Sequence, residues 1–108
     1  MNWRVEYLNA LVQEEIDSWP VDMRAKLTRI IDLIEDFGLQ QVREPYVKHL
    51  QDKLWEMRVS GHEGIARAIY VTVRERRVVI LHAFRKKTRK TPGQAISLAM
   101  ERMKEITP

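Results

Sequence analysis

The sequence predicts one α+β domain over residues 1–108: an antiparallel-rich twisted sheet packed against an N-terminal helix hairpin, with a C-terminal helix. Two observations carry this prediction. Apolar residues recur at every second position in some stretches and at helical spacing in others. The later strands follow one another through short connections, which favours an antiparallel meander. The expected order is β-α-α-β-β-β-α, in a chain whose length is typical of one domain.

The first elements are a strand and a helix. Trp3, Val5 and Tyr7 alternate with polar residues, which indicates a short strand with one buried face. Apolar residues at helical spacing then predict a first helix that runs to about Ser18. Pro20 breaks the chain after it.

A second helix follows, and its apolar residues form one stripe. They are Met23, Leu27, Ile30, Ile34 and Phe37. Gly38 stands where a left-handed C-cap belongs, so the two helices are expected to form an antiparallel hairpin over the sheet. Residues 39–53 are polar, contain Pro45 and show little periodicity, and are expected to be a loop.

The next strand shows a clear alternation. Trp55, Met57 and Val59 face one way, and Glu56 and Arg58 the other. Since the helix hairpin covers one face of the sheet, the other face is expected to be open and to hold Glu56, Arg58 or their neighbours.

Two further strands and a helix complete the chain. Residues 65–73 and 78–84 are mostly apolar and are expected to be strands, and residues 74–76 make a tight reversal between them. Thr91 and Pro92 then have helix-start chemistry, with the hydroxyl as cap and proline at the first helical position. Apolar residues at helical spacing from Ile96 to Ile106 predict an amphipathic final helix.

Composition excludes several classes of protein. The chain has no cysteine, so it has no disulfide, no thiolate catalysis and no cysteine-ligated zinc. No apolar run approaches the roughly 20 residues that span a bilayer, and the N-terminus has no signal-peptide pattern. We therefore expect a cytoplasmic protein without membrane contact.

Charge is distributed unevenly along the chain. Residues 1–56 hold 7 Lys/Arg and 11 Asp/Glu, whereas residues 57–108 hold 12 Lys/Arg and 4 Asp/Glu. An acidic first half and a basic second half suggest nucleic-acid contact through the second half.

The cations of the second half gather in two places. A loop after the last strand carries five positive charges within six residues, and these are Arg85, Lys86, Lys87, Arg89 and Lys90. Such a loop can be merely solvated, but its place between a buried strand and a helix favours binding of a polyanion, RNA or DNA. A second cluster lies at a hairpin tip and suggests solubility or diffuse attraction to RNA; its members are Arg74, Arg76 and Arg77.

Arg67 is the least expected cation, because it lies on an apolar strand two residues from Ile65 and Ile69. It has either a structural role, as the cross-strand ion-pair partner of Glu56, or a binding or catalytic role. On an antiparallel sheet, Arg58, Arg67 and residues 85–87 can converge around one phosphate and stabilise charge that grows during phosphoryl transfer.

Other chemistries have little support. The histidines, His49, His62 and His82, show no paired spacing, so a metal site is not expected. His82 lies on a buried strand and is expected to be a hydrogen-bonded core residue. There is no phosphate-cradling glycine loop, no dinucleotide fingerprint and no stacking motif of the RNA-recognition type.

Three segments together resemble a known family. They are LWEMRV (54–59), ARAIYV (66–71) and ILHAFRKKTRKTP (80–92). They look like the phage-derived, HigB-like branch of the RelE/ParE toxin superfamily, in which a "KKTxKTP" segment and an "LWELR" strand recur. The resemblance covers nearly the whole chain and implies a RelE-like fold.

The resemblance also implies a function. Such proteins are toxins of type II toxin–antitoxin systems, and they cleave messenger RNA, usually on the ribosome, without a metal or other cofactor. The 2′-hydroxyl attacks the adjacent phosphate, and the products are a cyclic phosphate or 3′-phosphate and a free 5′-hydroxyl. The implied partners are messenger RNA, the ribosome and a cognate helix-turn-helix antitoxin.

By the same resemblance, Arg67 corresponds to a strand arginine that stabilises phosphate. Arg58 lies where relatives carry a basic residue, and residues 85–87 lie where relatives place a cation. Glu56 occupies a position that is acidic in this branch, which makes it a candidate base. The predicted catalytic set is therefore Arg67, Arg58, Lys86 and Glu56, with the remaining clustered cations as RNA contacts. Two alternatives stay open: a ParE-like toxin that inhibits DNA gyrase, and a basic RNA-binding module without catalysis.

Overall fold

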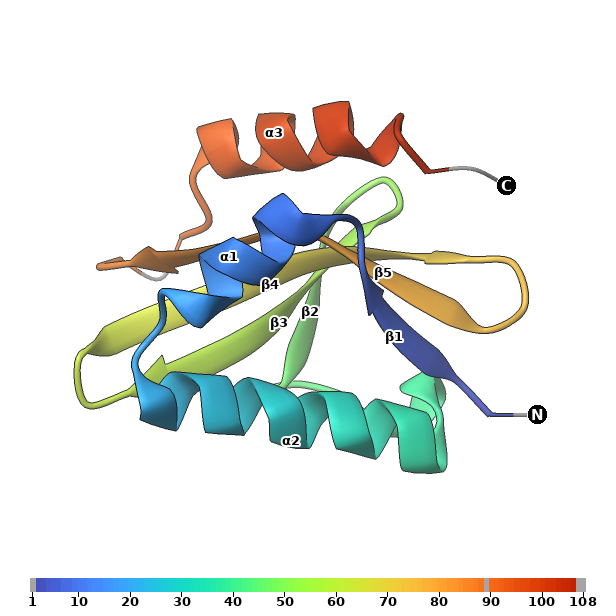
Figure 1. Cartoon of the computed structure of the whole chain (residues 1–108), viewed down its shortest axis with the longest axis horizontal. Helices are drawn as coiled ribbons and strands as arrows, with labels where there is room; N and C mark the ends of the chain where they lie inside the picture. The colour runs from blue at the N-terminus through green and yellow to red at the C-terminus, as the bar shows by residue number, and fades with distance from the viewer. Residues whose placement is uncertain (1, 89, 107–108) are drawn as a thin grey trace.

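A computed structural model describes residues 2–88 and 90–106, and Arg89 lies outside the described residues. The chain forms a five-stranded sheet with the spatial order β1-β5-β4-β3-β2 (Figure 1). The strands are β1 (Arg4–Tyr7), β2 (Val47–Gln51), β3 (Leu54–Gly61), β4 (Gly64–Val73) and β5 (Arg77–Lys86).

Helices lie on both faces of this sheet (Figure 1). They are α1 (Ala10–Asp17), α2 (Val21–Phe37) and α3 (Gly93–Met103). The first two run in opposite directions and bury Val12, Ile16, Met23, Leu27 and others against one face, so the predicted N-terminal helix hairpin is confirmed. Within the described residues, no helix is long and apolar enough to cross a membrane.

The strand pairing agrees with the predicted antiparallel-rich sheet. β2, β3, β4 and β5 form an antiparallel meander. β1 instead pairs in parallel with β5, with Val5 opposite Val78. The α+β class and the place of the helices are confirmed, and the element order differs from the prediction by one strand.

That additional strand corrects one expectation. Residues 39–53 are not simply a loop: they contain a short 3-10 helix, η1 (Leu39–Gln41), and the edge strand β2. Of the five β2 residues, Val47 alone is buried, since β2 has a neighbour on one side only. A strand with one buried side chain carries almost no hydrophobic alternation, which is why the pattern was not visible.

A second correction concerns the face that was expected to be open. Helix α3 covers much of it and buries Leu54, Ile69, Val71 and Leu81 there together with its own Ala95 and Ala99. A sheet with helices on both faces can bury residues on both sides of a strand.

Helix α3 is attached by a buried ion pair. The guanidinium of Arg102 donates to both carboxylate oxygens of Glu15 on α1, each at 2.9 Å, and to the carbonyl of Leu81 on β5 at 3.0 Å. Glu15 also accepts from the backbone N–H of Ala83 at 3.1 Å and lies 3.0 Å from His82 Nδ1. His82 is therefore hydrogen-bonded, as expected, but it is partly exposed and does not belong to the buried core.

The glycine at the end of α2 has a conformation that other residues avoid. Gly38 has φ +93° and ψ 151°, so its φ is positive as predicted, although its ψ is that of an extended chain and not of a left-handed cap. A Cβ there would lie 3.3 Å from Trp3 and Gln40 side-chain atoms.

We expect Gly38→Ala to lower the free energy of unfolding by about 1–3 kcal/mol, because this backbone region is nearly restricted to glycine. The matched control is Gly93→Ala, where a Cβ meets nothing within 4 Å. Urea denaturation of both variants measures the difference, and equal midpoints for the two variants would contradict it.

Candidate functional site

Four charged side chains share one face at one end of the sheet. Glu56 and Arg58 lie on β3, Arg67 on β4 and Lys86 on β5. The strand register brings them together, since Arg58 is directly opposite Arg67, and Ile65, two residues before Arg67, is opposite Lys86. We refer to Glu56, Arg58, Arg67 and Lys86 as the charged cluster. It lies beyond the part of this face that α3 covers.

The core of the charged cluster is buried. Glu56 is 2% exposed and Arg67 is 3% exposed. The Glu56 carboxylate lies 3.4 Å from Arg67 Nε and 3.6 Å from Arg58 Nε, so the cross-strand ion pair of Glu56 with Arg67, one of the two roles considered for Arg67, is present. Arg67 also donates to the carbonyl of Ala66 at 2.9 Å.

The two arginines still have unused hydrogen-bonding capacity. Across the described part of the chain, the Nε atoms of Arg58 and Arg67 are the buried side-chain polar atoms without a hydrogen-bond partner. Leaving a buried donor without a hydrogen bond costs free energy, and a bound anion that accepts a hydrogen bond from it recovers this cost. Burial lowers the pKa of the Arg67 guanidinium, Glu56 opposes this effect and Arg58 reinforces it. Two adjacent guanidinium groups with one carboxylate between them carry a net positive charge that suits a phosphate.

The segment before α3 closes over the charged cluster. Thr91 Oγ1 donates to Glu56 Oε1 at 2.6 Å, and Lys86 Nζ donates to Thr91 Oγ1 at 3.4 Å. The predicted helix start is therefore corrected: α3 begins at Gly93 with Pro92 as its N-cap residue, and no side chain caps it. The Thr91 hydroxyl does not accept from a backbone N–H of α3 and instead donates to the Glu56 carboxylate, in a charge-assisted hydrogen bond.

Lys86 has an unusual proton affinity for a lysine. Burial lowers the pKa of its ammonium group to about 8, and the positive charge of Arg67 acts in the same direction. Glu56 opposes the shift. At neutral pH the group is still mostly protonated, yet it gives up its proton far more readily than an exposed lysine.

Sequence comparison gives the family of this chain. The family model described as "Phage derived protein Gp49-like (DUF891)" matches residues 14–104, which include every member of the charged cluster. The chain belongs to the Gp49-like family. No curated protein matches the sequence.

Solved structures with a similar fold include two RelE proteins. A free mutant form of the E. coli toxin RelE superposes with a TM-score of 0.66 at 12% identity, over 95% of this chain and 99% of that one. A chain of the archaeal RelE–RelB complex from Pyrococcus horikoshii OT3 gives a TM-score of 0.60 at 22% identity, over 83% of this chain and 100% of that one. The predicted RelE-like fold is confirmed, and the matching family is described as phage derived, as expected.

The other described cations of the basic loop in this Gp49-like protein are Arg85, Lys87 and Lys90, and they do not all face the charged cluster. Arg85 is exposed on the opposite face from Lys86 and donates to the Glu63 carbonyl at 3.0 Å. It therefore does not converge with Arg58 and Arg67, because consecutive residues of a strand point to opposite faces. Lys87 and Lys90 are exposed on the segment that leads to α3.

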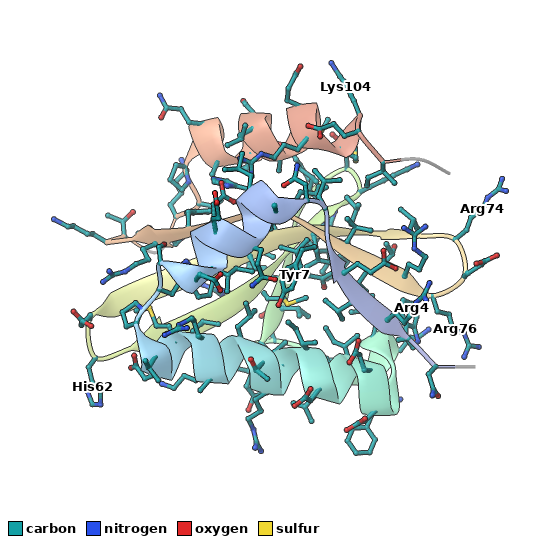
Figure 2. All side chains as sticks on the ribbon, viewed as in Figure 1. Arg4, Tyr7, His62, Arg74, Arg76 and Lys104 are labelled. Atoms are coloured by element: carbon teal, nitrogen blue, oxygen red, sulfur yellow. The ribbon has the colours of Figure 1, made fainter. Side chains whose placement is uncertain are left out.

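The cations at the β4–β5 hairpin are remote from the cluster. Arg74 and Arg76 lie at the tip, at the opposite end of the molecule from His62 in the β3–β4 turn (Figure 2). Arg77 forms a two-point ion pair with Glu6 at 2.8 and 3.1 Å, which joins β5 to β1. These positions form a separate surface of the Gp49-like protein.

Sequence reasoning missed two further cations beside the cluster. Lys26 and Arg29, exposed residues of α2, line a cleft of about 600 Å³ together with Arg58 and Arg67. On the sequence they are ordinary charges on the polar face of an amphipathic helix. Only the packing of α2 beside β3 places them next to the strand arginines.

Proposed function

We propose that this Gp49-like protein is the toxin of a type II toxin–antitoxin system, and that it acts as an endoribonuclease that cleaves messenger RNA without a metal. The observation that supports this most is the pairing of Arg58 and the buried Arg67 with the buried Glu56, with Lys86 on the same face. A structural ion pair alone does not require a second arginine, a lysine of lowered pKa and unsatisfied guanidinium donors in one place.

In the proposed reaction, the scissile phosphate binds against Arg58 and Arg67. The ribose 2′-oxygen attacks phosphorus while the bond from phosphorus to the 5′-oxygen breaks, which leaves a 2′,3′-cyclic phosphate and a 5′-hydroxyl. The arginines stabilise the additional negative charge of the pentavalent transition state. The protein thus replaces the charge neutralisation that a metal ion provides in other nucleases.

Two proton transfers complete this chemistry. Glu56 accepts the proton of the 2′-hydroxyl once the substrate hydroxyl takes the place of Thr91 on Oε1. Lys86 gives a proton to the leaving 5′-oxygen, a role that suits an ammonium group with a pKa of about 8. Because the displaced Thr91 hydroxyl and the substrate hydroxyl are the same kind of donor, the exchange keeps the Glu56 carboxylate hydrogen-bonded.

The proposal includes the partners of such a toxin. The proposed toxin meets messenger RNA on the ribosome. The basic surface around the charged cluster suits binding to the ribosome, because ribosomal RNA is rich in phosphate. A cognate antitoxin protein, of the helix-turn-helix type, is proposed as the neutralising partner. The similar fold of a chain from a RelE–RelB complex supports a protein partner, and the type of antitoxin is part of the proposal.

The deciding experiment is induced expression in a bacterium without the antitoxin, with messenger RNA 5′ ends mapped before and shortly after induction. We expect growth arrest and new 5′-hydroxyl ends at codon-phased positions. Growth arrest with intact messenger RNA and induced DNA damage would instead indicate a gyrase inhibitor. RNA binding without arrest would indicate a binding module.

The role of Lys86 predicts a pH dependence. As a general acid Lys86 must be protonated, so single-turnover cleavage of ribosome-bound messenger RNA should decline as pH rises through about 8. Lys86→Arg keeps the positive charge but stays protonated throughout this range, so the variant should be slow and should lose the decline. A variant that keeps the same decline would contradict the assignment of Lys86.

A further inference from the structure

We propose that the cleft between β3 and α2 is a second binding site for single-stranded RNA, with Lys26 and Arg29 as phosphate contacts and Tyr46 as a stacking platform. This inference rests on the proposed function and extends it to a surface on the other side of the sheet edge. In this inference, the scissile phosphate binds at the charged cluster and a neighbouring nucleotide of the same RNA strand binds in the cleft.

The cleft exists because β2 is shorter than β3. The pairing of these strands ends at Val47, which is opposite Met57, and the last hydrogen bond joins Arg58 N–H to the Tyr46 carbonyl at 2.8 Å. The end of β3 therefore has β4 on one side and no strand on the other. In place of a strand, Lys26 reaches across from α2 and donates to the Ser60 carbonyl at 2.6 Å.

The charge of the cleft favours an anion. Four of its lining residues, Lys26, Arg29, Arg58 and Arg67, are cations, and none of the described lining residues is acidic. Asp22, one turn before Lys26 on α2, does not line the cleft and accepts a hydrogen bond from His62 N–H at 3.1 Å. Glu56 pairs with Arg58 and Arg67 from the other side, so the four cations keep a net positive charge on one concave surface, and such a surface attracts a polyanion.

The apolar part of the cleft favours a nucleotide over a simple anion. Tyr46 is 49% exposed, and Pro45, Ile30 and Leu33 lie beside it. An exposed aromatic ring next to cations is the arrangement on which unpaired bases stack in single-stranded nucleic-acid sites. At about 600 Å³, the cleft is in the range of sites that hold small organic ligands.

The cleft and the charged cluster share two residues. Arg58 and Arg67 line the cleft and also hold Glu56, so a strand bound at one site continues directly to the other. RNA would pass from the α3 side of the sheet over the free edge of β3 to α2. This geometry lets nucleotides beside the scissile bond contribute binding energy that positions the phosphate.

An anisotropy titration with a labelled single-stranded RNA tests the cleft. The RNA carries 2′-O-methyl groups, which prevent cleavage, and binding is measured between 50 and 200 mM salt. The test variant is Lys26→Gln/Arg29→Gln, in which the glutamine amide at position 26 can still donate to Ser60. The control is Lys53→Gln/Lys104→Gln, which removes the same charge from the β2–β3 turn and the C-terminal end of α3.

We expect the test variant to reduce the slope of log affinity against log salt by about 1.4, since each phosphate contact to a single strand contributes about 0.7. Tyr46→Ala should weaken binding by about tenfold or more without a change of slope. The control pair should leave the slope near that of the wild type.

Two results would overturn the cleft as an RNA site. One is a test variant with the same slope as the control. The other is a test variant that binds RNA normally but no longer binds the antitoxin, which would make the cleft a protein-docking surface. Messenger RNA cleavage is measured in parallel, so that the two proposals fail separately. If the wild type cleaves messenger RNA but the salt slope of the test variant is unchanged, only the cleft proposal is refuted. If the test variant shows the expected change of slope but the wild type does not cleave messenger RNA, only the nuclease proposal is refuted.

Discussion

Arg67→Ala is expected to slow messenger RNA cleavage by at least about 100-fold and to abolish growth arrest, because the variant loses a buried guanidinium at the proposed phosphate position. Loss of one preorganised charge donor typically has an effect of this size. Arg67→Lys should keep the charge but not the planar donor geometry, so its cleavage activity should lie between that of the wild type and that of Arg67→Ala. Growth after induction and the amount of new RNA 5′ ends measure both variants.

A matched control separates activity from stability. Arg77→Ala also breaks an ion pair, with Glu6, but that pair lies at the β1–β5 side of the sheet. It should lower thermal stability while toxicity persists. Neutralising Lys86 and Lys87 together should also end growth arrest. Full toxicity of folded Arg67→Ala, judged by its circular dichroism and melting curve, would refute the catalytic assignment.

The largest effect on stability is expected from Arg102→Ala. This change removes the partner of Glu15 and three hydrogen bonds at once, and it leaves a carboxylate between α1 and β5 without its guanidinium. Breaking a buried ion pair by removing one partner costs about 3 kcal/mol or more. The low end applies because Glu15 keeps some exposure to solvent. Urea denaturation measures the loss, and Lys104→Ala, which affects an exposed pair with Glu101, should change almost nothing.

The same ion pair predicts how stability depends on acid. Burial acts to raise the pKa of Glu15, but hydrogen bonds from Arg102, Ala83 and His82 outweigh it and hold the pKa below the usual 4.5. A carboxylate with a lowered pKa in the folded state contributes stability above its unfolded pKa and loses it as pH falls through the folded pKa. The wild type should therefore lose stability below about pH 4.5 more steeply than Arg102→Ala. Parallel curves for the two proteins would contradict this.

Most of the fold could be predicted from the sequence because most elements bury one clear face. The stripe from Met23 to Ile34 identified α2, and the alternation of Met57 and Val59 identified β3. The edge strand β2 lacked such a face, since Val47 is its one fully buried residue. Prediction from periodicity fails where a strand is held by backbone hydrogen bonds and not by side-chain burial.

Only those contacts of the site that follow from the register of neighbouring strands could be predicted from the sequence. Glu56 and Arg67 lie on neighbouring strands joined by a short turn, so their meeting followed from the pattern. The contact of Thr91 with Glu56 spans 35 residues and depends on where α3 docks. The approach of Lys26 to Ser60 spans 34 residues and depends on the angle of α2. Side-chain packing sets both, and no short segment of sequence encodes it.

The parallel pairing of β1 with β5 has a consequence for the synthesis of this protein. The first strand must wait for residues 77–80 before it finds its partner, so the growing chain cannot close its sheet early. Contacts between residues so far apart slow folding. The charged cluster needs β3, β4 and β5 side by side, and therefore a nascent chain on its own ribosome has no assembled site until β5 has emerged. This order of events delays any activity of the new chain towards the message from which it is being translated.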